Sequence, residues 1–178
     1  MTFVRARWPW LVGLSAGLAA VVFVLVWFEP QALFIDERVS DPVPVAAEMP
    51  TDGVAAAPTT AVAPGPVELA SGDLVSLDHG TSGRVRVLRL ADGSRYVRLE
   101  GLRTENGPAV RVYLSTNPAD GAEGAFDDEF VDLGELQGNL GDQNYLVPAD
   151  AEPLAYASVV IWCERFDSAF GAADLVAS

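Results

Sequence analysis

Two side chains suited to redox or ligand chemistry each occur once among the 178 residues, Cys163 and His79. A thiol can give up electrons or bind a metal as thiolate, and an imidazole can ligate a metal or move a proton. With one of each, the chain cannot hold a cluster bound by four cysteines, form an intrachain disulfide, or supply both histidines of a blue-copper site. A four-ligand zinc site would need carboxylate substitutes, so we predict no metal centre.

Cys163 ends an apolar run at 158–163 (SVVIWC). In a β-strand, alternation puts Cys163 on the same face as Val159 and Ile161, with Trp162 on the other face. Such surroundings disfavour a charged thiolate. Three interpretations stay open: an inert core residue, a ligand to a cofactor such as haem, and a redox-active thiol.

His79 lies in the segment 78–83 (DHGTSG), a turn ahead of the first clear strand. As the only imidazole it is the candidate second ligand for a haem bound by Cys163, with Met49 as the one other candidate. A histidine that is hydrogen-bonded within its own turn is the alternative, and it is the simpler one.

The chain is acidic, with 25 Asp and Glu against 11 basic residues and a net charge of −14. This balance argues against nucleic acid as a partner, because a phosphate backbone needs a basic face. The acids at 127–129 and 132 lack the spacing of an EF-hand loop, so we interpret them as a solvated loop. No motif supports hydrolase or nucleotide chemistry, and we expect a protein that does not turn over a substrate.

The elements that must position Cys163 are strands, because the C-terminal part alternates polar and apolar residues. Alternating runs lie at 84–90, 96–99, 110–114, 130–133 and 144–147, and turns separate them at 91–94, 106–108, 117–121 and 138–142. With 158–163 as a central strand covered on both faces, we predict an all-β domain, an antiparallel sandwich or barrel of seven to eight strands. The arginines at 84, 86, 98 and 111 fall on the solvent faces of their strands.

A membrane anchor is predicted at 8–28, a run of uncharged, mostly apolar residues with tryptophans near both ends. Arg5 and Arg7 precede the run and acids follow it, so residues 1–7 are expected in the cytoplasm and the rest of the chain outside the membrane. A cleaved signal peptide is the alternative, disfavoured by the length of the run and the lack of an A-x-A site. Gly13 and Gly17 form a G-x-x-x-G pattern through which two helices could pair as a homodimer.

Residues 29–66 are rich in proline, alanine and valine and show no helical or alternating period beyond the anchor. We interpret them as a disordered linker that separates the anchor from a domain at 67–178.

Four segments of that domain carry a family resemblance: DHGTSGRVRVLRLADGSRYVRLEGL, NGPAVRVYLS, FVDLGELQGNLGDQNYLVP and ASVVIWCERFDSAFGAADL. In order and spacing they resemble the DM-thirteen domain, a module also found beside DOMON domains. The resemblance implies electron transfer through the cysteine at 163, as thiol or haem ligand, together with a redox partner protein. The alternative is a non-catalytic cell-surface binding module in which Cys163 only packs.

Overall fold

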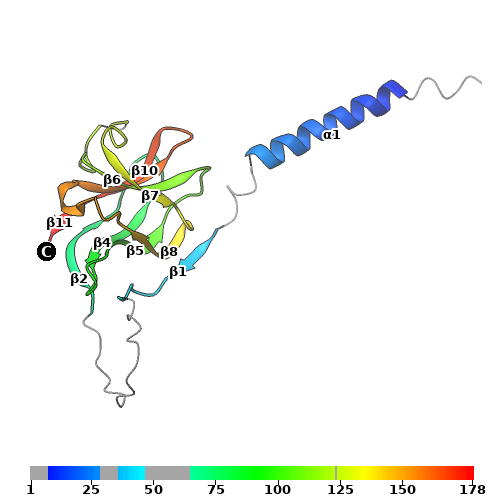
Figure 1. The fold of residues 1–178 in the computed structure, drawn as a ribbon. Helices are drawn as coiled ribbons and strands as arrows, with labels where there is room; N and C mark the ends of the chain where they lie inside the picture. The colour runs from blue at the N-terminus through cyan, green and yellow to red at the C-terminus, as the bar shows by residue number, and fades with distance from the viewer. Residues whose placement is uncertain (1–7, 29–35, 47–64, 123) are drawn as a thin grey trace, which may run out of the picture.

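The computed structural model describes residues 8–28, 36–46, 65–122 and 124–178, with the side chains of its helix described over 11–23. The predicted helix is present as α1 (Trp8–Phe28) (Figure 1). Over 11–23 its large apolar side chains are exposed, with Leu14 74% and Leu18 63% accessible. Among the described residues, which include only 11–23 of α1 with their side chains, no helix is both long and apolar enough to cross a bilayer.

The domain consists of two β-sheets packed face to face, a sandwich as the alternating pattern predicted (Figure 1). The six-stranded sheet has the order β1-β8-β5-β4-β2-β11, and the five-stranded sheet has the order β3-β10-β9-β6-β7. The described residues thus form eleven strands rather than seven to eight, because several are only two or three residues long. The bounds are β1 (Arg38–Ser40), β2 (Val67–Asp73), β3 (Val75–Ser76), β4 (Ser82–Arg89), β5 (Arg95–Arg103), β6 (Val110–Ser115), β7 (Phe130–Glu135), β8 (Leu140–Leu146), β9 (Ser158–Cys163), β10 (Ser168–Asp174) and β11 (Val176–Ala177), with a 3₁₀ turn at Pro153–Ala155.

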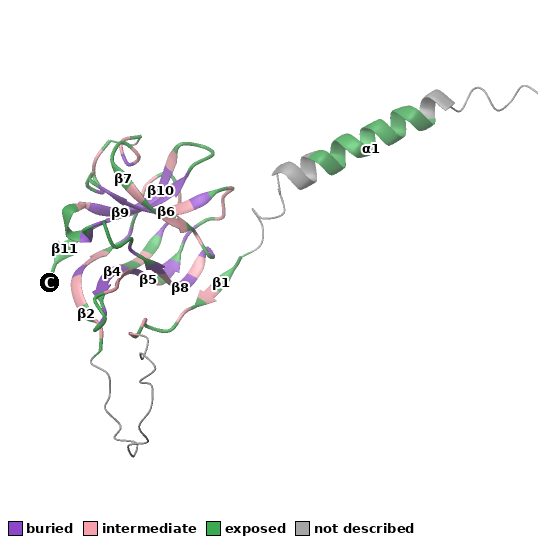
Figure 2. Cartoon of the chain, in the orientation of Figure 1, coloured by how far each residue is buried: buried purple, intermediate pink, exposed green. Residues whose placement is uncertain are grey.

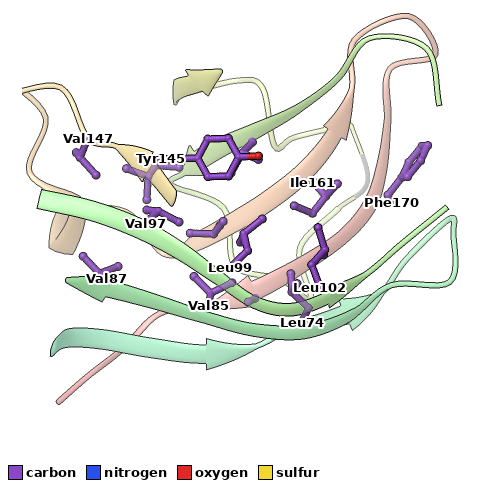
Figure 3. Close-up of a cluster of buried hydrophobic side chains, with 14 of the residues drawn as sticks. Leu74, Val85, Val87, Val97, Leu99, Leu102, Tyr145, Val147, Ile161 and Phe170 are labelled. Atoms are coloured by element: carbon purple, nitrogen blue, oxygen red, sulfur yellow. The ribbon is translucent and has the colours of Figure 1, made fainter. Parts of the chain in front are cut away.

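The main core lies between the sheets and is built from valine, leucine and isoleucine that alternate along the strands (Figure 3). Val85, Val87, Val97 and Leu99 point inward from the six-stranded sheet, and Ile161 points inward from the other. A fully buried aliphatic side chain contributes about 1.5–3 kcal/mol through removal from water, so this layer fixes the pairing of the sheets.

A second apolar cluster covers the outer face of the five-stranded sheet. Val160 and Trp162 belong to it, together with Phe126 from the segment between β6 and β7. All six residues of β9 are therefore buried, as predicted for a central strand covered on both faces (Figure 2).

Residues 38–40 differ from the sequence prediction, which placed them in the linker. They form β1, which pairs in parallel with the edge of β8, whereas the other strand pairs of the domain are antiparallel. A strand of three residues is too short for its alternation to show. The predicted turn at 138–142 also differs, because Leu140–Asp142 begin β8 as the partners of β1.

Arg98 corrects a second expectation. Arg84 is half exposed as predicted, but Arg98 is only 3% exposed. Its strand position does face outward; the backbone of Asp41 and Pro42 covers it and accepts hydrogen bonds from its guanidinium. Sequence alternation identifies the face of a sheet, but not a distant segment that packs on that face.

Candidate functional site

Cys163 is the last residue of β9 and lies inside the main core. It is fully buried, in the same apolar cluster as Val159, Ile161 and Phe170. Trp162 points to the opposite face, so the alternation predicted from the sequence is confirmed. The neighbouring strands place Val110 and Ser168 in register with Cys163.

The thiol is held beneath the loop that precedes β6. Its Sγ–H donates to the carbonyl oxygen of Pro108 over 3.2 Å, and the amide of Glu164 donates to Ala109 over 3.1 Å. Ala109 adopts the left-handed region, with φ of 60°, which is uncommon for a residue with a Cβ. The loop at 106–109, which we call the thiol loop, therefore shields the sulfur from solvent.

His79 is part of a separate arrangement at the surface. Its Nδ1 lies 2.9 Å from Oε2 of Glu105, and its ring packs against Phe170 at a centroid distance of 3.9 Å. The hydrogen bond with His79 is the main cause that holds the pKa of Glu105 below its usual value of 4.5. The imidazole is thus bonded to a neighbouring loop, which was not foreseen from the sequence because Glu105 lies 26 residues away.

A haem between Cys163 and His79 does not fit this arrangement. Cys163 is fully buried and its thiol already donates to a carbonyl, while His79 faces Glu105 at the surface. The groove of about 610 Å³ at the edges of β2, β3 and β11 is lined by neither residue. The geometry therefore favours an inert core thiol or a redox-active thiol over a haem ligand among the interpretations of Cys163.

On the opposite face of β9, an aromatic cluster that the sequence did not reveal joins Trp162 to the surface. Tyr113 stacks on Trp162 with ring centroids 6.4 Å apart and donates its hydroxyl to Glu164 over 3.0 Å. Burial, and next the bond to the Glu164 carboxylate, raise the pKa of Tyr113 far above its ordinary range. A packed aromatic layer, bonded to a half-exposed carboxylate, thus lies on the face of the sheet opposite to the Cys163 side chain.

The arrangement defines a class of protein: a small β-sandwich domain with a single shielded thiol in its core. The model of one family, described as Electron transfer DM13, matches residues 73–175, more than half of the chain. The chain belongs to the DM13 family, as the sequence resemblance predicted. No curated protein and no solved structure matches it.

Proposed function

We propose that this chain is a membrane-anchored electron-transfer module whose redox-active group is the Cys163 thiol. The observation that carries the proposal is the placement of the only cysteine at the centre of a domain from an electron-transfer family. A lone exported thiol also risks pairing between molecules, and burial protects it from that reaction.

Burial decides which redox chemistry suits this thiol. A peroxide or a disulfide must touch the sulfur, and the thiol loop blocks that approach. An electron needs no such contact, because it can pass through packed protein. In the step we propose, the Cys163 thiol loses one electron to a high-potential, metal-centred oxidant of a partner protein. Its proton passes to water when the thiol loop opens, which gives a thiyl radical, and the reverse transfer of electron and proton restores the thiol.

The anchor is the second part of the proposal. Support comes from the 21 residues of α1, which carry no charge, and from its exposed leucine and valine side chains. Arg5 and Arg7 before the helix favour a single-pass protein with its N-terminus in the cytoplasm and its domain outside. No neighbouring atom lies within 4 Å of a Cβ built on Gly13 or Gly17, so a second helix could pack closely against this face. If it does, a Gly17→Ile substitution should abolish crosslinking of the homodimer.

Flash oxidation of the full-length chain in detergent tests the role of the thiol. A photogenerated ruthenium(III) polypyridyl complex serves as the one-electron oxidant, and the decay of its absorbance gives the rate at which the protein loses electrons. We expect a slower decay in Cys163→Ala than in the native protein, and the native rate in the control Val159→Ala, which removes bulk from the same strand and cluster.

Two results would change the proposal. If the native protein and Cys163→Ala lose electrons at the same rate, Cys163 only packs in the core. The second candidate function, a non-catalytic binding module, then stands. The close packing around the thiol favours that candidate. If added haemin gives a Soret band that disappears in Cys163→Ala, the cysteine is a haem ligand instead.

A further inference from the structure

Strand β1 occupies an edge of the sandwich that is shaped to receive it. A Cβ added at Gly138 would lie 2.5 Å from the carbonyl oxygen of Glu37, and one at Gly141 would collide with the carbonyl oxygen of Val39. Glycine at both positions therefore lets the backbone of 37–39 approach β8 closely.

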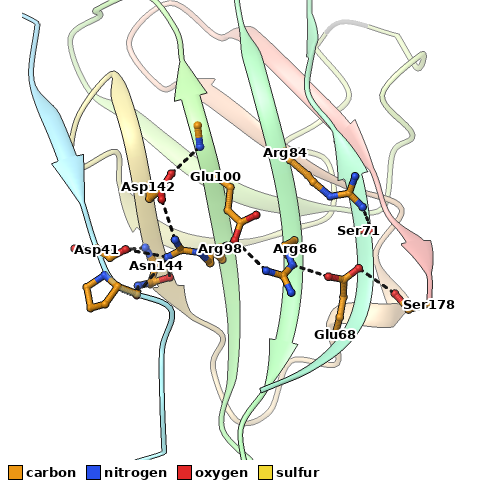
Figure 4. A network of polar contacts seen from close by, with 12 residues as sticks. Asp41, Glu68, Ser71, Arg84, Arg86, Arg98, Glu100, Asp142, Asn144 and Ser178 are labelled. Carbon is orange, nitrogen blue, oxygen red and sulfur yellow. Dashed lines mark hydrogen bonds and ion pairs between the residues drawn. The ribbon is translucent and has the colours of Figure 1, made fainter. Parts of the chain in front are cut away.

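Polar side chains complete this edge, and they bind backbone groups of the docked segment. The amide of Glu37 donates to Oδ1 of Asn139 over 2.8 Å, and Nδ2 of Asn144 donates to the carbonyl of Pro42 over 2.8 Å. Arg98 donates to the carbonyls of Asp41 and Pro42 (Figure 4). Backbone pairing combined with fixed side-chain contacts is the usual way in which a sheet edge binds an extended peptide.

Most of this receptor lies in one motif of the sequence, 138–144 (GNLGDQN). Gly138, Asn139, Gly141 and Asn144 all belong to it, and each contacts or makes room for residues 36–42. The motif lies within the family match at 73–175, whereas the segment that it binds lies outside that match. In this chain the motif binds the segment next to the anchor, and these contacts do not involve Cys163.

Docking of β1 shortens the tether between α1 and the domain. From Phe28 to Arg38 there are ten residues, which reach at most about 35 Å when fully extended. If the domain were attached only at Val67, the 39 residues after Phe28 could reach roughly 135 Å. Residues 43–66 then connect two points on the same domain and add nothing to its distance from the anchor.

We propose that residues 36–42, the clamp, hold the domain close to the bilayer surface, so that a protein partner must meet it at the membrane. The inference rests on the proposed anchor, but it does not depend on Cys163. The clamp binds intramolecularly, because 43–66 tether it to the domain, and effective concentrations in the millimolar range keep even a weak strand docked.

Energy transfer in vesicles tests the clamp on the full-length chain. A donor dye on Ala149→Cys, an exposed position, reports its distance from acceptor dyes on lipid headgroups. Val39→Pro removes a backbone donor from the middle of β1 and leaves the sequence of residues 65–178 unchanged, and Val45→Pro is the matched control at a 73% exposed position outside the strand. We expect transfer efficiency to fall at least two-fold in Val39→Pro and to stay at the native value in Val45→Pro.

Hydrogen exchange in the same samples shows whether β1 has detached. The amide of Leu140 donates to Glu37, and that of Asn144 to Asp41, so both should exchange faster in Val39→Pro. Faster exchange with unchanged energy transfer would overturn the clamp and leave the redox proposal intact. A chain that fails to sediment with vesicles would overturn the anchor and the clamp together. Flash oxidation of the native protein and of Cys163→Ala decides the redox proposal separately.

Discussion

Replacing Arg98 by methionine tests whether the polar network under the clamp stabilises the domain. Methionine keeps the unbranched aliphatic bulk but removes donors that bind Glu100 over 2.8 Å and Asp142 over 3.0 Å, in addition to those on the clamp. Breaking a buried ion pair costs about 3–5 kcal/mol. Glu100 and Asp142 are 29% and 40% exposed, so water solvates them in part, and we expect a loss of about 2–3 kcal/mol.

Urea unfolding of the detergent-solubilised chain, followed by the circular dichroism of its sheets, measures this loss. With a slope of about 2 kcal/mol per molar, the midpoint should fall by roughly 1–1.5 M. Arg84→Met is the matched control: Arg84 is 50% exposed, bonds to Ser71 and lies 3.8 Å from Asp73, so its loss should cost about 0–0.5 kcal/mol. Equal losses for the two variants would refute the reasoning.

The difference between native protein and Arg98→Met should also depend on pH. Burial would raise the pKa of Glu100, but hydrogen bonds from Arg98 and Arg86 outweigh it and hold the pKa below the usual 4.5. A carboxyl with a depressed folded-state pKa adds stability above its unfolded pKa and loses it as pH falls through the folded value. The advantage of the native protein should therefore shrink below about pH 4.5 and be constant above it.

Three further predictions concern the core and the site. Cys163 should react with thiol reagents in the native protein only as fast as the thiol loop opens. Val39→Pro should raise that rate about five-fold, because losing one hydrogen bond lowers the free energy of loop opening by about 1 kcal/mol. Burial raises the pKa of Tyr145 to about 12, above the value of about 10 in the unfolded chain. The stability that comes from this difference in pKa should be complete below pH 10 and be lost as pH rises toward 12. Absorbance and unfolding at alkaline pH would follow this loss. Gly171→Ala would place a Cβ 2.6 Å from a carbonyl oxygen of β3 and should cost about 1–3 kcal/mol in thermal unfolding, whereas Gly65→Ala, with no atom within 4 Å, should leave stability unchanged.

The sequence predicts best those strands whose side chains carry the packing. Ser158–Cys163 is apolar on both faces and has the predicted bounds. β2 escaped notice because its register shifts between Glu68 and Ala70, and such a bulge interrupts alternation. β10 escaped because alanine and glycine are weak strand formers, and Gly171 is required where β3 approaches closely.

The candidate site was predictable as a residue but not as a geometry. The count of cysteines identified Cys163, and strand alternation identified the face on which it lies. Its bond to Pro108 joins residues 55 apart in the sequence, and the bond of His79 depends on Glu105. Such contacts arise from the folding of the chain as a whole, and no local period in the sequence encodes them.

Asn139 connects the clamp to the thiol loop, which is why a substitution in β1 should affect Cys163. Both ends of its side-chain amide bind the clamp: Oδ1 accepts from Glu37 and Nδ2 donates to Asp36. The same Nδ2 donates to the carbonyl of Thr104 over 3.2 Å, and the amide of Thr104 donates to the backbone of Asn139 over 2.9 Å. Thr104 leads directly into the thiol loop.

Because Asn139 is 4% exposed, water cannot readily replace a lost partner, so release of β1 should loosen the covering of the thiol. A domain held at the membrane would then keep its thiol shielded, and a released domain would expose it.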